Sequence, residues 1–147
     1  MPETTTSIGP RLYFLHYGLD LFWQKPWLGW GTGAYYGEFC RIATTPEWCA
    51  AGSFHPHNQF LFFMIEHGIP GLLAFAAVFA AALWQAARME RLDRAVAFAF
   101  VGVACVGSLT HSGIWLANEG LAYSFGLVLV LTAPLRPCAK AQAGVPA

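Results

Sequence analysis

The sequence predicts an all-α membrane protein with about three transmembrane helices, preceded by a helical segment that lies outside the membrane or at its interface. Of its 147 residues, 56% are hydrophobic and only 11% are charged, against roughly 25% charged residues in a typical soluble protein. The few charges are also unevenly placed and leave long uncharged stretches. Disordered, coiled-coil and basic nucleic-acid-binding proteins all need far more charge, and the formal net charge here is zero, so we expect no nucleic-acid partner.

Three uncharged stretches predict the membrane spans. Residues 69–87 carry no charge, and residues 95–117 lie in a second uncharged stretch that ends at Asn118. At ~1.5 Å per residue these stretches reach about 28 and 36 Å, enough to cross a hydrocarbon core of about 30 Å. The third span, residues 118–135, is marginal in length because Glu119 has to stay near the interface. The first two stretches show no polar face, which disfavours a buried hairpin of a soluble bundle.

Basic residues predict the orientation of these spans. Three arginines lie in the connection 88–94, and two further basic residues lie in the tail 136–147. The connection between the second and third spans has neither Lys nor Arg. By the positive-inside rule we expect the connection 88–94 and the C-terminus in the cytoplasm. Residues 1–68 are then external, on the periplasmic side in a Gram-negative host.

The start of the chain does not resemble a signal peptide, because the first residues lack a basic stretch followed by an apolar one. The predicted topology nevertheless places residues 1–68 outside. We therefore expect the chain to be the C-terminal piece of a longer protein, with further transmembrane helices before Met1. A short complete protein with an external N-terminus is the alternative.

Residues 12–24 predict an amphipathic helix at the interface. Tyrosine and polar side chains recur on one stripe, and apolar side chains cover most of the remainder. Arg11 precedes this helix and projects onto its apolar side. It is either a snorkelling side chain or a cation directed at a buried anion.

Glycines at alternate positions follow in the stretch Pro-Trp-Leu-Gly-Trp-Gly-Thr-Gly. Glycine adopts positive φ angles readily, so this spacing suits a plain turn or a nest of N–H groups around an anion. In the second interpretation Gly31 and Gly33 bind substrate. The spacing is not that of a dinucleotide-binding loop.

Cys40 and Cys49 bracket eight residues that include a proline. In an oxidising external compartment, this pair forms a disulfide or remains as two free thiols.

The densest polar cluster is His55-Pro56-His57-Asn58, followed by an amphipathic run and by Gly-Ile-Pro-Gly at the start of the first span. The cluster lacks the spacings of common zinc sites, so we expect no metal. A histidine at the outer face of a membrane can accept a proton from a hydroxyl or donate a hydrogen bond to a phosphate. A loop histidine that caps a helix is the alternative. His111, within the second predicted span, is either functional or part of a helix–helix hydrogen bond.

These motifs together resemble the O-antigen ligase and O-antigen polymerase family over roughly residues 7–75. Members of that family are multi-pass inner-membrane glycosyltransferases that move a glycan from undecaprenyl pyrophosphate to a periplasmic acceptor. The resemblance implies that His57 is the general base on the acceptor hydroxyl, or supports the departing pyrophosphate, and that Arg11 pairs with the pyrophosphate. His55 and Asn58 would add substrate contacts. The implied partners are the lipid-linked glycan, the lipid A-core or another periplasmic acceptor, and membrane lipids, with no cofactor or metal.

The chain also departs from the family pattern. The upstream helices of the family, and the further arginines on its other periplasmic loops, have no counterpart in this sequence. We therefore expect the chain to be inactive alone. The alternatives are a fragment of a polysaccharide polymerase or of a protein O-oligosaccharyltransferase, and a small membrane protein without catalytic activity.

Overall fold

The computed structural model describes residues 8–52, 55–111 and 117–133. In these ranges the chain is helical and contains no β-strand, which confirms the predicted all-α class. The six helices are α1 (Ile8–Gln24), α2 (Tyr35–Ile42), α3 (Pro46–Gly52), α4 (Gln59–Ala87), α5 (Arg91–Thr110) and α6 (Ala117–Thr132).

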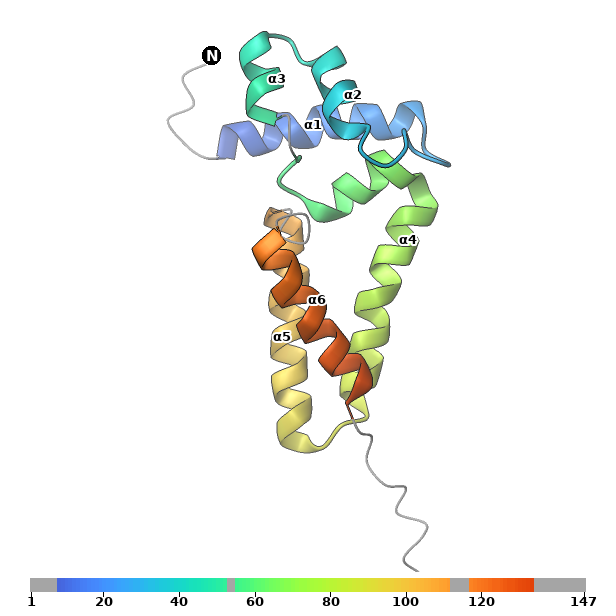
Figure 1. Ribbon diagram of the computed structural model, residues 1–147, viewed down its shortest axis with the longest axis vertical. Helices are drawn as coiled ribbons and strands as arrows, with labels where there is room; N and C mark the ends of the chain where they lie inside the picture. The colour runs from blue at the N-terminus through green and yellow to red at the C-terminus, as the bar shows by residue number, and fades with distance from the viewer. Residues whose placement is uncertain (1–7, 53–54, 112–116, 134–147) are drawn as a thin grey trace, which may run out of the picture.

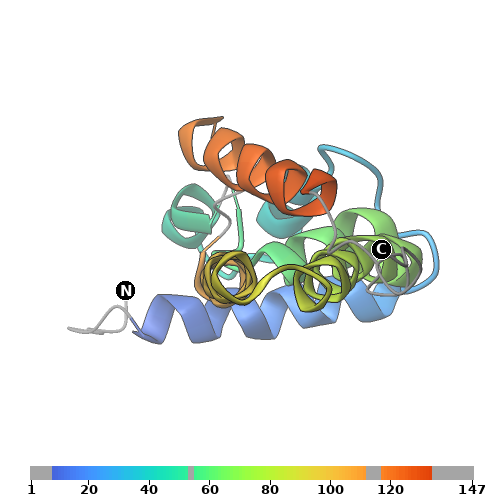
Figure 2. The same ribbon diagram turned by 90° about the horizontal axis from the view of Figure 1, so that it is seen from below.

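The helices form two layers (Figure 1). The upper layer contains α1, α2, α3 and the first part of α4. The lower layer is a bundle of the second part of α4 with α5 and α6, in which each helix packs against the other two. Seen from below, α4 and α5 are nearly end-on and α1 lies across them (Figure 2).

A kink in α4 joins the two layers. Asn58 caps the first part of the helix, because its Oδ1 accepts a hydrogen bond from the Leu61 N–H at 3.0 Å. The backbone then leaves the helical conformation at Gly68 (φ 66°, ψ −156°), and Pro70 follows in the first turn of the second part. The kink therefore falls where the sequence predicts the change from the external segment to the first span.

Two glycines allow the loop after α1 to cross this kink. Gly29 and Gly68 both have positive φ, and the Ile69 N–H donates to the Pro26 carbonyl at 2.8 Å. A Cβ atom added to Gly68 would lie 2.6 Å from the carbonyl oxygens of Pro26 and Trp27. A Cβ added to Gly29 would collide with the backbone of α4. Because neither glycine has a side chain, the backbones of the loop and of α4 can lie in direct contact.

Two helices of the bundle, α4 and α5, are long and apolar enough to cross a membrane, and α6 contains a shorter apolar stretch at Gly120–Thr132. In the most apolar 18-residue window of each long helix, only 22% is buried inside the protein. The core helix of a soluble protein would be mostly buried, so these helices need apolar surroundings.

The bounds of α5 differ from the expected span of residues 95–117. The helix begins at Arg91, because a helical turn tolerates polar residues and its N-terminus is preceded by an extended residue, Glu90. It ends at Thr110, and His111 is extended with φ −152° and ψ 152°. His111 therefore follows helix α5, whereas the sequence predicts it within the second span.

Each layer has its own apolar core. The upper core is rich in aromatic residues and comprises Phe14, Leu21, Phe22, Tyr35, Phe39, Trp48, Leu61, Phe62 and Ile65. The lower core contains small residues that let the helices approach closely, and comprises Phe75, Phe79, Ala82, Ala86, Met89, Ala97, Val101, Ala104, Leu127 and Val130.

The faces of α1 differ in part from the predicted amphipathic pattern. Tyr13, expected on the polar stripe, stacks on Trp48 of α3 with ring centroids 4.0 Å apart, and its hydroxyl lies 3.1 Å from the Thr44 hydroxyl. Leu15, on the predicted apolar side, is 41% exposed. The reason is that a tyrosine ring can be packed while its hydroxyl keeps a polar partner.

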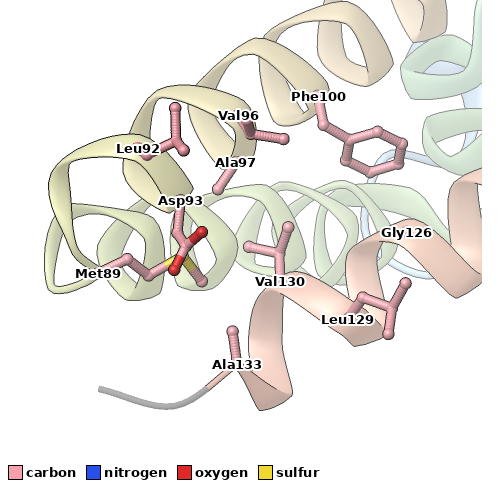
Figure 3. A pocket seen from close by; sticks show the side chains of 10 residues that line it. All are labelled: Met89, Leu92, Asp93, Val96, Ala97, Phe100, Gly126, Leu129, Val130 and Ala133. Atoms are coloured by element: carbon pink, nitrogen blue, oxygen red, sulfur yellow. The ribbon is translucent and has the colours of Figure 1, made fainter. Parts of the chain in front are cut away.

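An apolar pocket of about 430 Å³ opens between α5 and α6, near the connection that follows α4 (Figure 3). Val96 and Phe100 line it from α5, and Leu129 and Val130 line it from α6. Asp93 is the charged residue of its described lining.

Candidate functional site

The predicted site residues His55 and His57 lie where the two layers meet, and the structure brings a third histidine to them. The ring centroids of His55 and His57 are 4.4 Å apart. The ring of His111, which follows α5, is 5.5 Å from that of His55 and 5.9 Å from that of His57. We call these three residues the histidine cluster.

Arg11 of α1 and His57 line the same pocket, of about 170 Å³. Asn58, Leu15 and Leu109 are also part of its wall. The pocket thus joins residues from the start of α1, the turn before α4 and the end of α5. It places a permanent cation and a titratable base, the two predicted catalytic groups, around one small space.

His57 has an unusual backbone conformation. Its φ is +52°, which is uncommon for a residue with a side chain, although histidine tolerates it better than most. The His57 N–H donates to Nδ1 of His55 at 3.3 Å. Its ring stacks on Phe14 of α1, with centroids 5.4 Å apart and an angle of 26° between the planes. A conformation that costs about 1 kcal/mol or more is thus maintained by neighbours from other elements.

Burial keeps the two described turn histidines neutral at pH 7. It lowers the pKa of His55 from 6.5 to about 4, with smaller contributions from His57 and His111. Burial also lowers the pKa of His57, and the nearby His111 and Arg11 lower it further. A neutral imidazole has one ring nitrogen with a free electron pair. In His55 this nitrogen is Nδ1, which accepts the His57 N–H, so His57 is the better placed of the two to accept a proton.

Asn58 has a structural function in addition to its place in the pocket wall. Its side-chain oxygen caps α4, as described above. The cap considered as the alternative function for a loop histidine is therefore made by the asparagine next to it. This bond also fixes where α4 starts, and hence the position of His57 one residue earlier.

Gly31 and Gly33 lie at the other end of the first part of α4. The Gly33 N–H donates to the Glu66 carboxylate at 2.9 Å, and the Gly31 N–H donates to the Glu66 carbonyl at 2.9 Å. The Tyr35 N–H also approaches the Glu66 carboxylate, at 3.4 Å. Glu66 is only 2% exposed. The loop therefore forms a nest around an anion, but this anion belongs to the protein itself.

A disulfide joins Cys40 of α2 to Cys49 of α3. The bridge holds α3 beside α2, where Trp48 packs against α1. Cys49 is engaged in the disulfide, and the Glu66 carboxylate accepts backbone hydrogen bonds. Within residues 8–52, 55–111 and 117–133, no three His, Cys, Asp or Glu residues are arranged to hold a metal ion.

Sequence reasoning did not assign two residues that the structure places at important positions. His111 had two open interpretations, because its distance of more than 50 positions from His57 hides their contact. Glu66 is a single acidic residue in an apolar run, a pattern that indicates a buried partner for the carboxylate. The sequence did not indicate that the glycine-rich loop donates the hydrogen bonds to Glu66.

The fold and the site together define a helical membrane protein with a basic pocket at one end of its bundle. The sequence model of the O-antigen ligase family matches residues 3–76, half of the chain, and the chain belongs to this family. A protein of Rickettsia conorii, named as a candidate polysaccharide ligase, is 27% identical over 126 residues. The alignment covers 80% of this chain and 31% of the relative, so the chain spans about a third of that protein's length.

Proposed function

We propose that this chain supplies the acid–base and phosphate-binding part of a lipid-linked glycan ligase of the bacterial inner membrane. The donor is a glycan on undecaprenyl pyrophosphate, and the acceptor is a sugar hydroxyl of the lipid A-core. The observation that carries the proposal is the common pocket of Arg11 and His57, in which a cation faces a neutral base. Membership of the O-antigen ligase family supports the substrate class.

In the proposed reaction His57 removes the proton from the acceptor hydroxyl as the oxygen attacks the anomeric carbon of the glycan. A new C–O bond forms, the bond from the anomeric carbon to the diphosphate oxygen breaks, and the configuration inverts. The leaving group takes the bonding electron pair, and Arg11 stabilises its growing negative charge. The proton stays on His57 until solvent removes it.

We further propose that the upper layer faces the periplasm. The arginine-bearing connection between α4 and α5 lies at the opposite end of the bundle, and the positive-inside rule assigns it to the cytoplasm. Membrane lipids then contact the exposed faces of α4, α5 and α6. In this orientation the histidine cluster lies at the outer interface, where lipid pyrophosphate and a hydroxyl acceptor can meet.

The test is transfer in a strain that lacks its own ligase and carries a full-length family enzyme ending in this segment. His57→Ala should lower glycan transfer by about 100-fold or more, the usual contribution of a general base. Arg11→Ala should also abolish transfer at unchanged protein level. His16→Ala is the matched control, because His16 is an exposed histidine on α1 paired with Asp20. Near-normal transfer by His57→Ala would refute the proposed base.

The same strain identifies the acceptor. Glycan attached to lipid A-core supports the proposed ligase. Glycan found only as longer free polymer, or only on protein, would contradict this acceptor and would favour a polymerase or a protein O-oligosaccharyltransferase. We expect the 147-residue chain expressed alone to give no transfer, because it spans about a third of the relative.

A further inference from the structure

His111 comes to the site from a part of the chain that the family match does not include, since that match ends at residue 76. His111 follows the last turn of α5, where its N–H donates to the Gly107 carbonyl at 2.8 Å, and its own backbone is extended. Its ring is in contact with both histidines of the turn before α4. Neither the family match nor the proposed chemistry gives it a function.

We propose that His111 is a positioning residue for His57, which keeps the His57 ring in place and opposes a positive charge on it until an anion enters the pocket. The proposal rests on the proposed function, because it concerns the same histidine.

The His57 ring packs between two other rings. That ring is nearly parallel to Phe14 (26° between planes) and to His111 (30°). The turn itself supplies one weak hydrogen bond, from the His57 N–H to His55, and the backbone of His57 is left-handed. The direction of the ring is therefore determined by α1 and by the end of α5, which is a function that a packed side chain can perform.

The titratable and charged groups around His57 share one sign. The groups that face His57 are Arg11 from α1, His55 from the same turn and His111 from α5, and all are basic. The described lining of the Arg11–His57 pocket contains no carboxylate. A proton on one histidine therefore disfavours a proton on the next. Burial contributes most to the low pKa of His57, and the neighbouring His111 and Arg11 lower this pKa further.

A bound diphosphate reverses this balance. Its negative charge offsets the repulsion among the basic groups, so His57 becomes a stronger base when the donor is present. Proton removal from the acceptor is then coupled to donor binding, and an empty site does not hold a proton that would block the base.

The experiment is a histidine NMR titration of the complete 147-residue chain in detergent micelles, with 13C and 15N labels in the imidazole rings. His111→Phe keeps a flat ring that cannot carry a proton. We expect the titration midpoint of His57 to rise by up to about half a pH unit, the size for two unit charges about 6 Å apart in a water-like dielectric. His111→Ala should raise the midpoint and also change the ring-current shift that His57 receives from Phe14. His16→Phe, at an exposed position of α1, is the control and should change neither.

Inorganic pyrophosphate is the probe for the anion effect. It should raise the midpoint of His57 in the wild-type chain, and by less in Arg11→Gln. An unchanged midpoint and an unchanged ring-current shift in both His111 variants would overturn the proposal. A variant whose His16 and His67 ring signals stay in place is folded, since these histidines lie in α1 and in the first part of α4. His111→Gln provides a second uncharged side chain if His111→Phe does not fold.

Activity separates this proposal from the proposed function. In the full-length enzyme, His111→Phe should lower kcat, leave KM for the acceptor nearly unchanged and move the acid limb of the pH–rate profile upward with the His57 midpoint. If His57→Ala still transfers glycan while the NMR coupling is present, the proposed function fails and the positioning by His111 stands. If His57→Ala is inactive while the His111 variants match wild type in both assays, only the positioning fails.

Discussion

Replacing Gly68 by alanine should destabilise the junction between the two layers by about 2–6 kcal/mol. Gly68 has φ 66° and ψ −156°, a backbone region that is essentially restricted to glycine and costs a residue with a Cβ about 1–3 kcal/mol. The new methyl group would also overlap the backbone of Pro26 and Trp27, which cannot rotate away as a side chain would. Overpacking of this kind costs about 1–3 kcal/mol, and the two contributions add.

Two further glycines separate these contributions. Gly33 also has positive φ, at 80°, but a Cβ there would meet nothing within 4 Å, so Gly33→Ala should cost only about 1–2 kcal/mol. Gly37 lies in α2 with open space around it and no positive φ. Gly37→Ala should be neutral or stabilise the protein by up to about 1 kcal/mol, because alanine favours the helix.

The measurement is the free energy of unfolding in guanidinium chloride, for the full chain in detergent micelles. Tryptophan fluorescence reports on the contact between the loop after α1 and the α4 kink, because Trp27 and Trp30 lie in this loop. Far-UV circular dichroism reports on the helices. If Gly68→Ala lowers the free energy of unfolding no more than Gly33→Ala does, the loop backbone at Pro26 and Trp27 does not lie as close to Gly68 as described.

The remaining predictions use the same unfolding assay. Cys49→Ser should lower stability by about 2–3 kcal/mol, because the bridge to Cys40 closes a loop with a separation of nine residues; a reductant should have an equal effect on the wild type and none on the variant. Glu66→Gln should cost about 1–3 kcal/mol, because the buried carboxylate loses its charge-assisted hydrogen bonds; a neutral result would contradict the nest. Tyr35→Phe should be neutral or stabilise by about 1 kcal/mol, since within the described residues the buried hydroxyl has no hydrogen-bond partner, and a clear loss would reveal one. Stability should fall as the pH is lowered from 6.5 to 4, because folding lowers the pKa of His55 from 6.5 to about 4 and the unfolded chain binds more protons in this range. Above pH 6.5 His55 is neutral in both states, so stability should not depend on its titration there. His55→Gln should weaken the pH dependence.

Composition and charge placement were sufficient to predict the fold class. Apolar runs without charges identify helices that need apolar surroundings, and the start of the second part of α4 follows the predicted boundary at residue 69. The start of α5 was missed because a helix extends through polar residues, and Arg91 and Arg94 form its first turn. Hydropathy locates a hydrocarbon-sized stretch, whereas backbone hydrogen bonds determine where a helix begins and ends.

The site was predictable only in part. The turn residues His55 and His57 are adjacent in sequence, so their contact is local. Arg11 and His111 approach His57 because α1 and the end of α5 pack beside the turn before α4. The hydrophobic periodicity of one helix does not indicate which other segments it packs against. Arg11 was singled out through a family resemblance, and His111 had no comparable signal. Long-range packing therefore supplies what local pattern could not.

The separation of the site residues along the chain has a consequence for biosynthesis. Arg11 and His111 are 100 positions apart, and both face His57. At a synthesis rate of about 5–20 residues per second, the ribosome needs roughly 5–20 seconds to make the chain between them. During that interval the upper layer can already form, since its core uses residues up to Ile65, yet the pocket lacks a wall. The order of synthesis thus makes the scaffold first and completes the basic pocket only when α5 has been made and has packed against α4.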